Sequence, residues 1–158
     1  TKCIFCGNKA SNNDKKNHIL ERSQHAFSML NLYPYNNGHI MVAPYRHVKS
    51  LEQLSDNELQ DLMKLVNKTK RTLDKKLKPH GYNIGLNIGK VAGAGFAGHV
   101  HIHIVPRWAG DTNFLPVLGE TKVVPQYLDE TYQTLHLAFR EWTRAKRKKI
   151  DFRHDFGK

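Results

Sequence analysis

The chain has 158 residues, of which 39% are hydrophobic, and its 25 Lys and Arg against 14 Asp and Glu give a formal net charge of +11. A chain of this length can bury a core without disulfides, so we expect a single domain. No apolar run approaches the roughly 20 residues that cross a bilayer, and residues 1–6 lack the apolar core of a signal peptide. The sequence therefore predicts a cytoplasmic protein with no membrane partner, and the positive charge favours a polyanionic one.

Cys3 and Cys6, the only cysteines, form a Cys-x-x-Cys motif. A redox motif of this kind needs a thioredoxin-like strand and helix around it, which the polar residues 7–14 do not predict. Half of a tetrahedral zinc site fits better, and it would need two further ligands, for which histidines are the most plausible. Two reduced cysteines without a metal are the alternative. Residues 8–16 are rich in turn-forming residues and are predicted to form a loop.

Three strands are predicted next. Residues 17–22 and 26–32 flank a short turn near Ser23, which indicates a β-hairpin. Pro, Asn and Gly in residues 33–38 predict a turn, and a third strand over residues 39–43 should end at Pro44. Asn31 and His39 are polar residues at strand ends, where a structural hydrogen bond is the ordinary explanation.

Ser55 and Glu58 form a capping box, which predicts the start of a helix. Apolar residues then recur at helical spacing until Pro79 and Gly81 end the helix. They are Leu59, Leu62, Met63, Val66, Leu73 and Leu77. This pattern indicates a helix with one face in the core and a solvated basic face.

A strand predicted over residues 82–88 leads into a glycine-rich segment that includes Gly93 and Gly95. Glycine lets a backbone approach a ligand and aim several N–H groups at phosphate. The segment lacks the Gly-Lys-Ser/Thr of a Walker loop and opens onto a strand, so it is neither a Walker loop nor a dinucleotide fingerprint. Because it directly precedes three histidines, we interpret it as a phosphate-binding loop. A plain flexible loop is the alternative.

His99, His101 and His103 alternate with β-branched residues. Alternate residues of a strand share a face, so the three imidazoles should lie together, with Val100, Ile102 and Ile104 on the core face. Same-face residues are roughly 7 Å apart, which suits attack on phosphorus by one ring while its neighbours bind oxygens. The pattern therefore favours phosphoryl or nucleotidyl transfer. A metal site is the sharper alternative, because imidazole is a common zinc ligand.

After the histidines, Trp108 lies in an irregular segment, where it could stack on a base or pack against its own domain. A second amphipathic helix is predicted from Pro125 to about Arg147. The order of short strands with two helices among them predicts an α+β domain with an antiparallel sheet.

The run His-x-His-x-His followed by two apolar residues, complete at residues 99–105, resembles the signature of the histidine-triad (HIT) superfamily. Residues 106–114 are similar to the branch that acts on dinucleoside polyphosphates such as diadenosine tetraphosphate. The resemblance implies a HIT-like fold with about five antiparallel strands, two main helices and a homodimer. We predict a HIT domain over residues 1–140, followed by the end of the last helix and a basic tail over residues 141–158.

The resemblance also implies roles for single residues. The catalytic group is predicted to be His101 as nucleophile, His103 as hydrogen-bond donor to the substrate and His39 as support for the triad. Structural zinc would be bound by Cys3, Cys6, His47 and His99. Substrate binding is assigned to Asn31, Asn87, Gly95, Phe96 and Trp108. Gly95 stands where the best-known members have a glutamine, which leaves the acceptor, water or phosphate, open.

For attack through Nε2, His101 needs its proton on Nδ1, where a backbone carbonyl could bind it. Its ordinary pKa near 6.5 keeps the ring mostly neutral, and loop N–H groups around Gly95 and Phe96 would stabilise the developing charge.

Two other functions are compatible with the sequence. One is a nucleoside phosphoramidate hydrolase of the same superfamily. The other is a nucleic-acid-binding module, because residues 140–158 hold eight basic and three acidic residues. The basic run at residues 146–149 contains no interleaved aromatic side chains and leaves the triad unexplained, so nucleic acid is not an expected partner.

Overall fold

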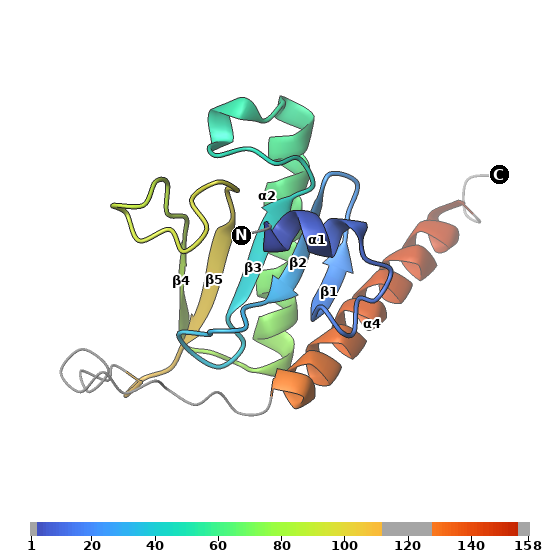
Figure 1. The fold of residues 1–158 in the computed structure, drawn as a ribbon. Helices are drawn as coiled ribbons and strands as arrows, with labels where there is room; N and C mark the ends of the chain where they lie inside the picture. Colours follow the sequence, from blue (N-terminus) through green and yellow to red (C-terminus); the bar gives the residue numbers. More distant parts are fainter. Residues whose placement is uncertain (1–2, 112–127, 155–158) are drawn as a thin grey trace.

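A computed structural model describes residues 3–111 and 128–154, which form an α+β fold on one antiparallel sheet (Figure 1). The strand order is β1-β2-β3-β5-β4. The elements are α1 (Ile4–Ala10), β1 (Ile19–Arg22), β2 (Ala26–Leu30), β3 (Ile40–Pro44), the 3-10 helix η1 (Leu51–Gln53), α2 (Asp56–Lys76), β4 (Gly81–Gly85), β5 (Ile102–Arg107) and α4 (Leu128–His154). The predicted fold class, with five strands and two main helices, is confirmed.

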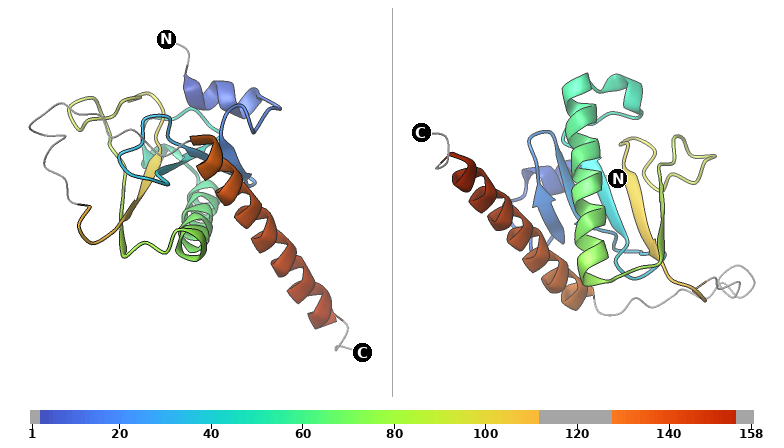
Figure 2. Two further views of the ribbon diagram at one scale, coloured as in Figure 1. Left: turned by 90° about the horizontal axis from the view of Figure 1, so that it is seen from below. Right: turned by 180° about the vertical axis from the view of Figure 1, so that it is seen from behind.

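Helices α2 and α4 cover one face of the sheet (Figure 2). The predicted capping box is present: the Ser55 hydroxyl accepts a hydrogen bond from the Glu58 N–H, and the Glu58 carboxylate accepts one from the Ser55 N–H. Met63 was placed in the core by the sequence pattern but is 49% exposed. It follows the buried Leu62, and one helical step of about 100° turns it away from the sheet. No helix among the described residues is long and apolar enough to span a membrane.

Helix α4 continues past the predicted end at Arg147 to His154, while its predicted start at Pro125 lies outside the described residues. It also runs without a break across residues 140 and 141, where the predicted domain would give way to the tail. Its buried residues Tyr132, Leu135 and Phe139 belong to the main core, as their helical spacing predicted.

Helix α1 was not predicted, because its residues were assigned to the cysteine motif and a polar loop. It lies on the sheet face opposite α2 (Figure 1). Phe5, 1% exposed, joins it to a second apolar cluster that includes Phe27, Met29 and Met41. Through Phe5, this cluster packs against the rings of His99 and His101.

Strand β5 begins at Ile102, later than predicted, so it contains His103 while His99 and His101 precede it. The reason is that the Val100 N–H donates to the carbonyl oxygen of Val48, in the loop after β3, instead of to a neighbouring strand. The predicted sorting of side chains still holds, because Val100, Ile102 and Ile104 are in the main core. The register pairs Met41 with His103, on the same face as the second cluster.

The turn before β3 depends on Gly38, whose φ of +74° lies in the left-handed region. A Cβ built on this residue would lie 2.5 Å from Leu77 Cδ1. The turn places the next residue, His39, directly before β3.

We expect Gly38→Ala to lower the free energy of unfolding by about 1–2 kcal/mol, since a non-glycine residue is strained at this φ. Urea unfolding measures the change. Gly85→Ala is the matched control, because a Cβ there meets nothing within 4 Å and its φ is not in the left-handed region. Equal losses in the two variants would contradict this explanation.

Candidate active site

His101 and His103 form the centre of the candidate site, with ring centroids 4.7 Å apart. His101 is 5% exposed and packs on Phe5, whose ring centroid is 4.7 Å away. His103 is half-buried. Two of the three predicted triad rings, those of His101 and His103, are therefore adjacent, and His101 is the less accessible of the two.

The tautomer of His101 follows from one hydrogen bond. Its Nδ1 lies 2.8 Å from the carbonyl oxygen of His99, which can only accept, so Nδ1 carries the proton. Nε2 then has a free lone pair. Burial lowers the pKa of His101, which keeps the ring neutral. This is the protonation state that the sequence analysis required of a nucleophile.

The tautomer of His103 is set by His39. The backbone N–H of Tyr35 donates to His39 Nδ1 at 3.0 Å, which places the His39 proton on Nε2. That Nε2–H then donates to His103 Nδ1 at 2.9 Å. His103 must therefore carry its own proton on Nε2, the remaining nitrogen, from which it can donate to a ligand. This arrangement corresponds to the predicted supporting role of His39.

Burial is also the main reason why these two rings stay uncharged. Burial, followed by the adjacent His103 and His101, lowers the pKa of His39 to about 3. Burial, followed by His101, lowers the pKa of His103 to about 4. The site is thus a set of neutral imidazoles with fixed donors and acceptors.

Asn31 lies beside this group. Its Nδ2 is 3.4 Å from His39 Nδ1, and its Oδ1 accepts a hydrogen bond from the Tyr33 N–H. The Tyr35 ring packs on His39 and His103, with centroids 4.6 and 5.8 Å away. Sequence reasoning missed Tyr35 and Phe5, because Tyr35 meets His103, and Phe5 meets His99 and His101, only through contacts between distant segments.

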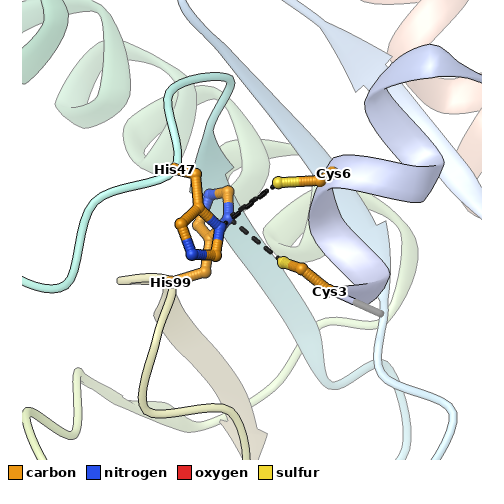
Figure 3. A group of neighbouring side chains, drawn as sticks. All are labelled: Cys3, Cys6, His47 and His99. Carbon is orange, nitrogen blue, oxygen red and sulfur yellow. Dashed lines mark hydrogen bonds between the residues drawn. The ribbon is translucent and has the colours of Figure 1, made fainter. Parts of the chain in front are cut away.

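The four predicted metal ligands converge at the N-terminal end of β5 (Figure 3). Their ligand atoms all lie within 4.8 Å of one another. The closest approaches join Cys6 Sγ to His47 Nδ1 at 3.3 Å and Cys3 Sγ to His99 Nδ1 at 3.4 Å. His99, buried against Phe5, thus belongs to this group more than to the nucleophile pair.

These separations fit a tetrahedral zinc ion. Zinc bonds of about 2.3 Å to sulfur and 2.0–2.1 Å to nitrogen hold such atoms roughly 3.5 Å apart. His99 is also correctly oriented, because its Nε2–H donates to the Pro44 carbonyl oxygen at 2.9 Å, so that Nδ1, which faces the cysteine sulfurs, carries the lone pair that a metal requires. A carbonyl partner of this kind is common behind a metal-binding histidine.

The glycine-rich loop meets the histidines, as predicted. A Cβ on Gly95 would meet nothing within 4 Å, so the backbone is open there. Asn87 Nδ2 donates to the Gly93 carbonyl oxygen at 3.4 Å and so braces the loop. The Phe96 ring packs edge-on against Phe5, with centroids 6.3 Å apart, so only its backbone N–H is a candidate ligand for substrate.

Trp108 lies apart from the other predicted site residues. It follows the last residue of β5, whereas His101 precedes the first. Seven residues of extended chain span about 23 Å, so one chain does not bring Trp108 beside His101. Its N–H donates to Asp111, in the turn after β5, and its predicted role in base binding stays a prediction.

Comparison with known proteins gives consistent matches. A family model described as HIT domain matches residues 12–110. A Mycobacterium tuberculosis protein named AP-4-A phosphorylase is 45% identical over 131 residues, covering 83% of this chain and 66% of the relative, just under two thirds of its length. An uncharacterized HIT-like protein of Methanocaldococcus jannaschii is 38% identical, covering 84% of this chain and 98% of the relative. A Zn-bound histidine triad family protein from Mycobacterium smegmatis has the same fold, with a TM-score of 0.72 at 22% identity, covering 91% of this chain and 97% of that one.

The low pKa of His39 predicts a loss of stability in mild acid. The unfolded chain protonates this residue near pH 6.5, whereas the folded chain does so only near pH 3. The free energy of unfolding should therefore fall as the pH decreases between these values, by at most about 1.4 kcal/mol per pH unit from this group, and be unaffected by it above that window.

Urea unfolding in EDTA at several pH values measures the slope. His39→Asn, whose side-chain oxygen can still accept from the Tyr35 N–H, should show a shallower slope than the wild type. His80→Asn replaces an exposed histidine and should retain the wild-type slope. A wild-type slope in His39→Asn would contradict the assignment.

Proposed function

The chain belongs to the HIT domain family, and from this premise we propose that it cleaves dinucleoside polyphosphates such as diadenosine tetraphosphate. The hydrogen bond between His101 Nδ1 and the His99 carbonyl oxygen carries the proposal, because it leaves a neutral, nucleophilic Nε2. The 45% identical relative named AP-4-A phosphorylase supports the choice of substrate.

In the proposed reaction, His101 Nε2 attacks the α-phosphorus of one nucleotide. An N–P bond forms, and the bond from phosphorus to the bridging oxygen breaks. His103, which carries its proton on Nε2, donates a hydrogen bond to that oxygen as negative charge develops on it. With diadenosine tetraphosphate, ATP leaves and adenylate stays bound to His101.

An acceptor then attacks the adduct and regenerates the neutral histidine. We propose inorganic phosphate, which yields ADP, whereas water would yield AMP. The name of the relative supports phosphate. The open backbone at Gly95, where better-known members have a glutamine, supports a site with room for an acceptor larger than water.

The remaining substrate contacts are proposed from position. The N–H groups of Gly95 and Phe96 would bind phosphate oxygens, and Asn87 would support that loop through Gly93. Asn31 would bind the ribose or phosphate beside His39, to which it is already close.

We also propose that Cys3, Cys6, His47 and His99 bind a structural zinc ion, which is supported by their separations and by the Zn-bound neighbour in fold. Bound zinc would supply a cross-link between α1 and the segment before β5. His99 would then hold its own carbonyl oxygen in place for His101. Two cysteines that are not joined by a disulfide fit a reducing compartment, and we propose a cytoplasmic location.

A homodimer is proposed through β4. This strand lies at one edge of the sheet, and Ile84 on it is 45% exposed. An open edge presents unpaired backbone groups that proteins commonly cover.

His101→Ala should lower turnover by at least about a thousandfold while substrate still binds, because it removes the attacking imidazole and leaves in place the other groups proposed to bind the substrate. Steady-state rates and calorimetry measure both effects. Mass spectrometry of quenched wild-type enzyme should find a nucleotidyl adduct on His101, and His80→Ala should retain wild-type turnover. Near-normal turnover in His101→Ala would exclude this mechanism.

The same assay identifies substrate and acceptor. We expect ADP and ATP from diadenosine tetraphosphate when phosphate is present. AMP formed at an undiminished rate without phosphate would instead indicate a hydrolase. Faster cleavage of adenosine phosphoramidate than of any dinucleotide would favour the phosphoramidate alternative.

For the metal, elemental analysis should find about one zinc ion per chain, and chelation should lower the melting temperature, since metal binding adds to folding stability. Cys6→Ser should lose both the zinc and the effect of chelation. Ser50→Ala, a change of an uncharged side chain outside the site, should lose neither. A zinc-free wild-type protein from zinc-supplemented medium would contradict the assignment.

A further inference from the structure

Basic side chains gather on the helical face of the sheet, opposite the histidines. We name this surface the basic seam, since it follows the line where α2 and α4 pack together. It is defined by Lys64, Lys68, Arg71, Lys75, Arg140 and Arg144. All six lie on the two long helices, away from the proposed catalytic groups.

The basic seam is hollowed. One cavity of about 360 Å³ lies between β1, α2 and α4 and is lined by Lys64, Lys68 and Arg71. A second, of about 430 Å³, lies between β1 and α4 and is lined by Arg140 and Arg144. Both are within the size range of small-ligand sites, so the cations line concave surfaces instead of standing on a flat one.

The cavities of the seam are also lined by the carboxylates of Asp14, Glu21, Asp61 and Glu141, but these do not pair with all of its cations. Lys68 pairs with Glu21 at 3.0 Å, and Asp61 is occupied by hydrogen bonds from the Ser23 hydroxyl and a backbone N–H. Within the described part of the chain, Arg71, Arg140 and Arg144 have no carboxylate in salt-bridge range. Three guanidinium groups are thus available to an anion.

An aromatic ring lies among these cations. Trp142 lines the 360 Å³ cavity and a smaller one of about 150 Å³ beside it. The Arg71 guanidinium carbon and Lys75 Nζ lie 5.8 and 5.0 Å from its ring centroid. The run of basic residues 146–149 contains no aromatic side chain, but Trp142 lies about one helical turn before it on α4, beside cations of α2.

We propose that the basic seam binds single-stranded nucleic acid, with the arginines and lysines on phosphodiester groups and Trp142 against a base. Cations that follow a backbone combined with an aromatic stacking surface are typical of such sites. A groove with cavities favours a flexible strand over a flat anionic membrane. Beyond Arg144 the sequence of α4 adds four further basic residues, Lys146, Arg147, Lys148 and Lys149.

The test is binding of fluorescein-labelled RNA and DNA single strands of about 20 nucleotides, measured by anisotropy over a series of salt concentrations. We expect affinity to fall with salt. Arg140→Ala/Arg144→Ala should weaken binding roughly tenfold and reduce the slope of log K against log salt by about 1.4, which is about 0.7 for each lost phosphate contact. Trp142→Ala should weaken binding with little change in that slope.

Lys49→Ala/Lys78→Ala is the matched control, because it removes the same charge from exposed positions outside the cavities. It should retain wild-type affinity, and both double variants should retain wild-type circular dichroism and polyphosphate cleavage. An equal loss of affinity in the two double variants would show attraction by net charge alone and overturn the proposal. So would binding to phosphatidylserine vesicles without binding to either strand, or no binding at low salt.

Discussion

The hydrogen bond from His101 Nδ1–H to the carbonyl oxygen of His99 is the contact on which the chemistry of this molecule depends. It fixes the tautomer of one ring through the backbone of a residue two positions earlier. That residue is itself immobilised, since His99 donates to the Pro44 carbonyl oxygen and meets Cys3 across the other side of its ring. The four candidate metal ligands and the proposed nucleophile therefore depend on the same residue, because His99 belongs to the first group and its carbonyl oxygen orients His101.

Hydrogen bonds also fix the tautomers of the other two histidines of the site, His39 and His103. A main-chain N–H from the turn before β3 fixes His39, and His39 fixes His103. Three neighbouring imidazoles would repel one another if they were charged, and burial keeps them neutral. The fold thus supplies one lone pair and one N–H at neighbouring positions without any ionised side chain, which suits attack on a substrate that is already an anion.

Much of this could be predicted from the sequence, because the signals are local. The alternation of histidines with β-branched residues around His101 predicted which side chains enter the core, and the capping box predicted where α2 begins. The cysteine pair indicated two corners of a metal site, and resemblance supplied His47 and His99, which the structure brings together.

The remaining features depend on contacts between distant segments. Helix α1 is short, and it is stabilised by packing of Phe5 rather than by its own propensity. The late start of β5 follows from a bond to Val48, and the neighbours of Trp142 come from α2. Trp108 is close to the triad in sequence but lies beyond the far end of β5, and its role in base binding stays a prediction.

The position of Phe5 between the two cysteines links thiol chemistry to the nucleophile. Its ring touches both His99 and His101, and the seven-residue helix that carries it is too short to persist without its packing and its sulfur contacts. Oxidation of the sulfurs would release this helix and admit water to the His101 ring. We therefore expect exposure to peroxide to lower the proposed cleavage activity without modifying His101 or His103.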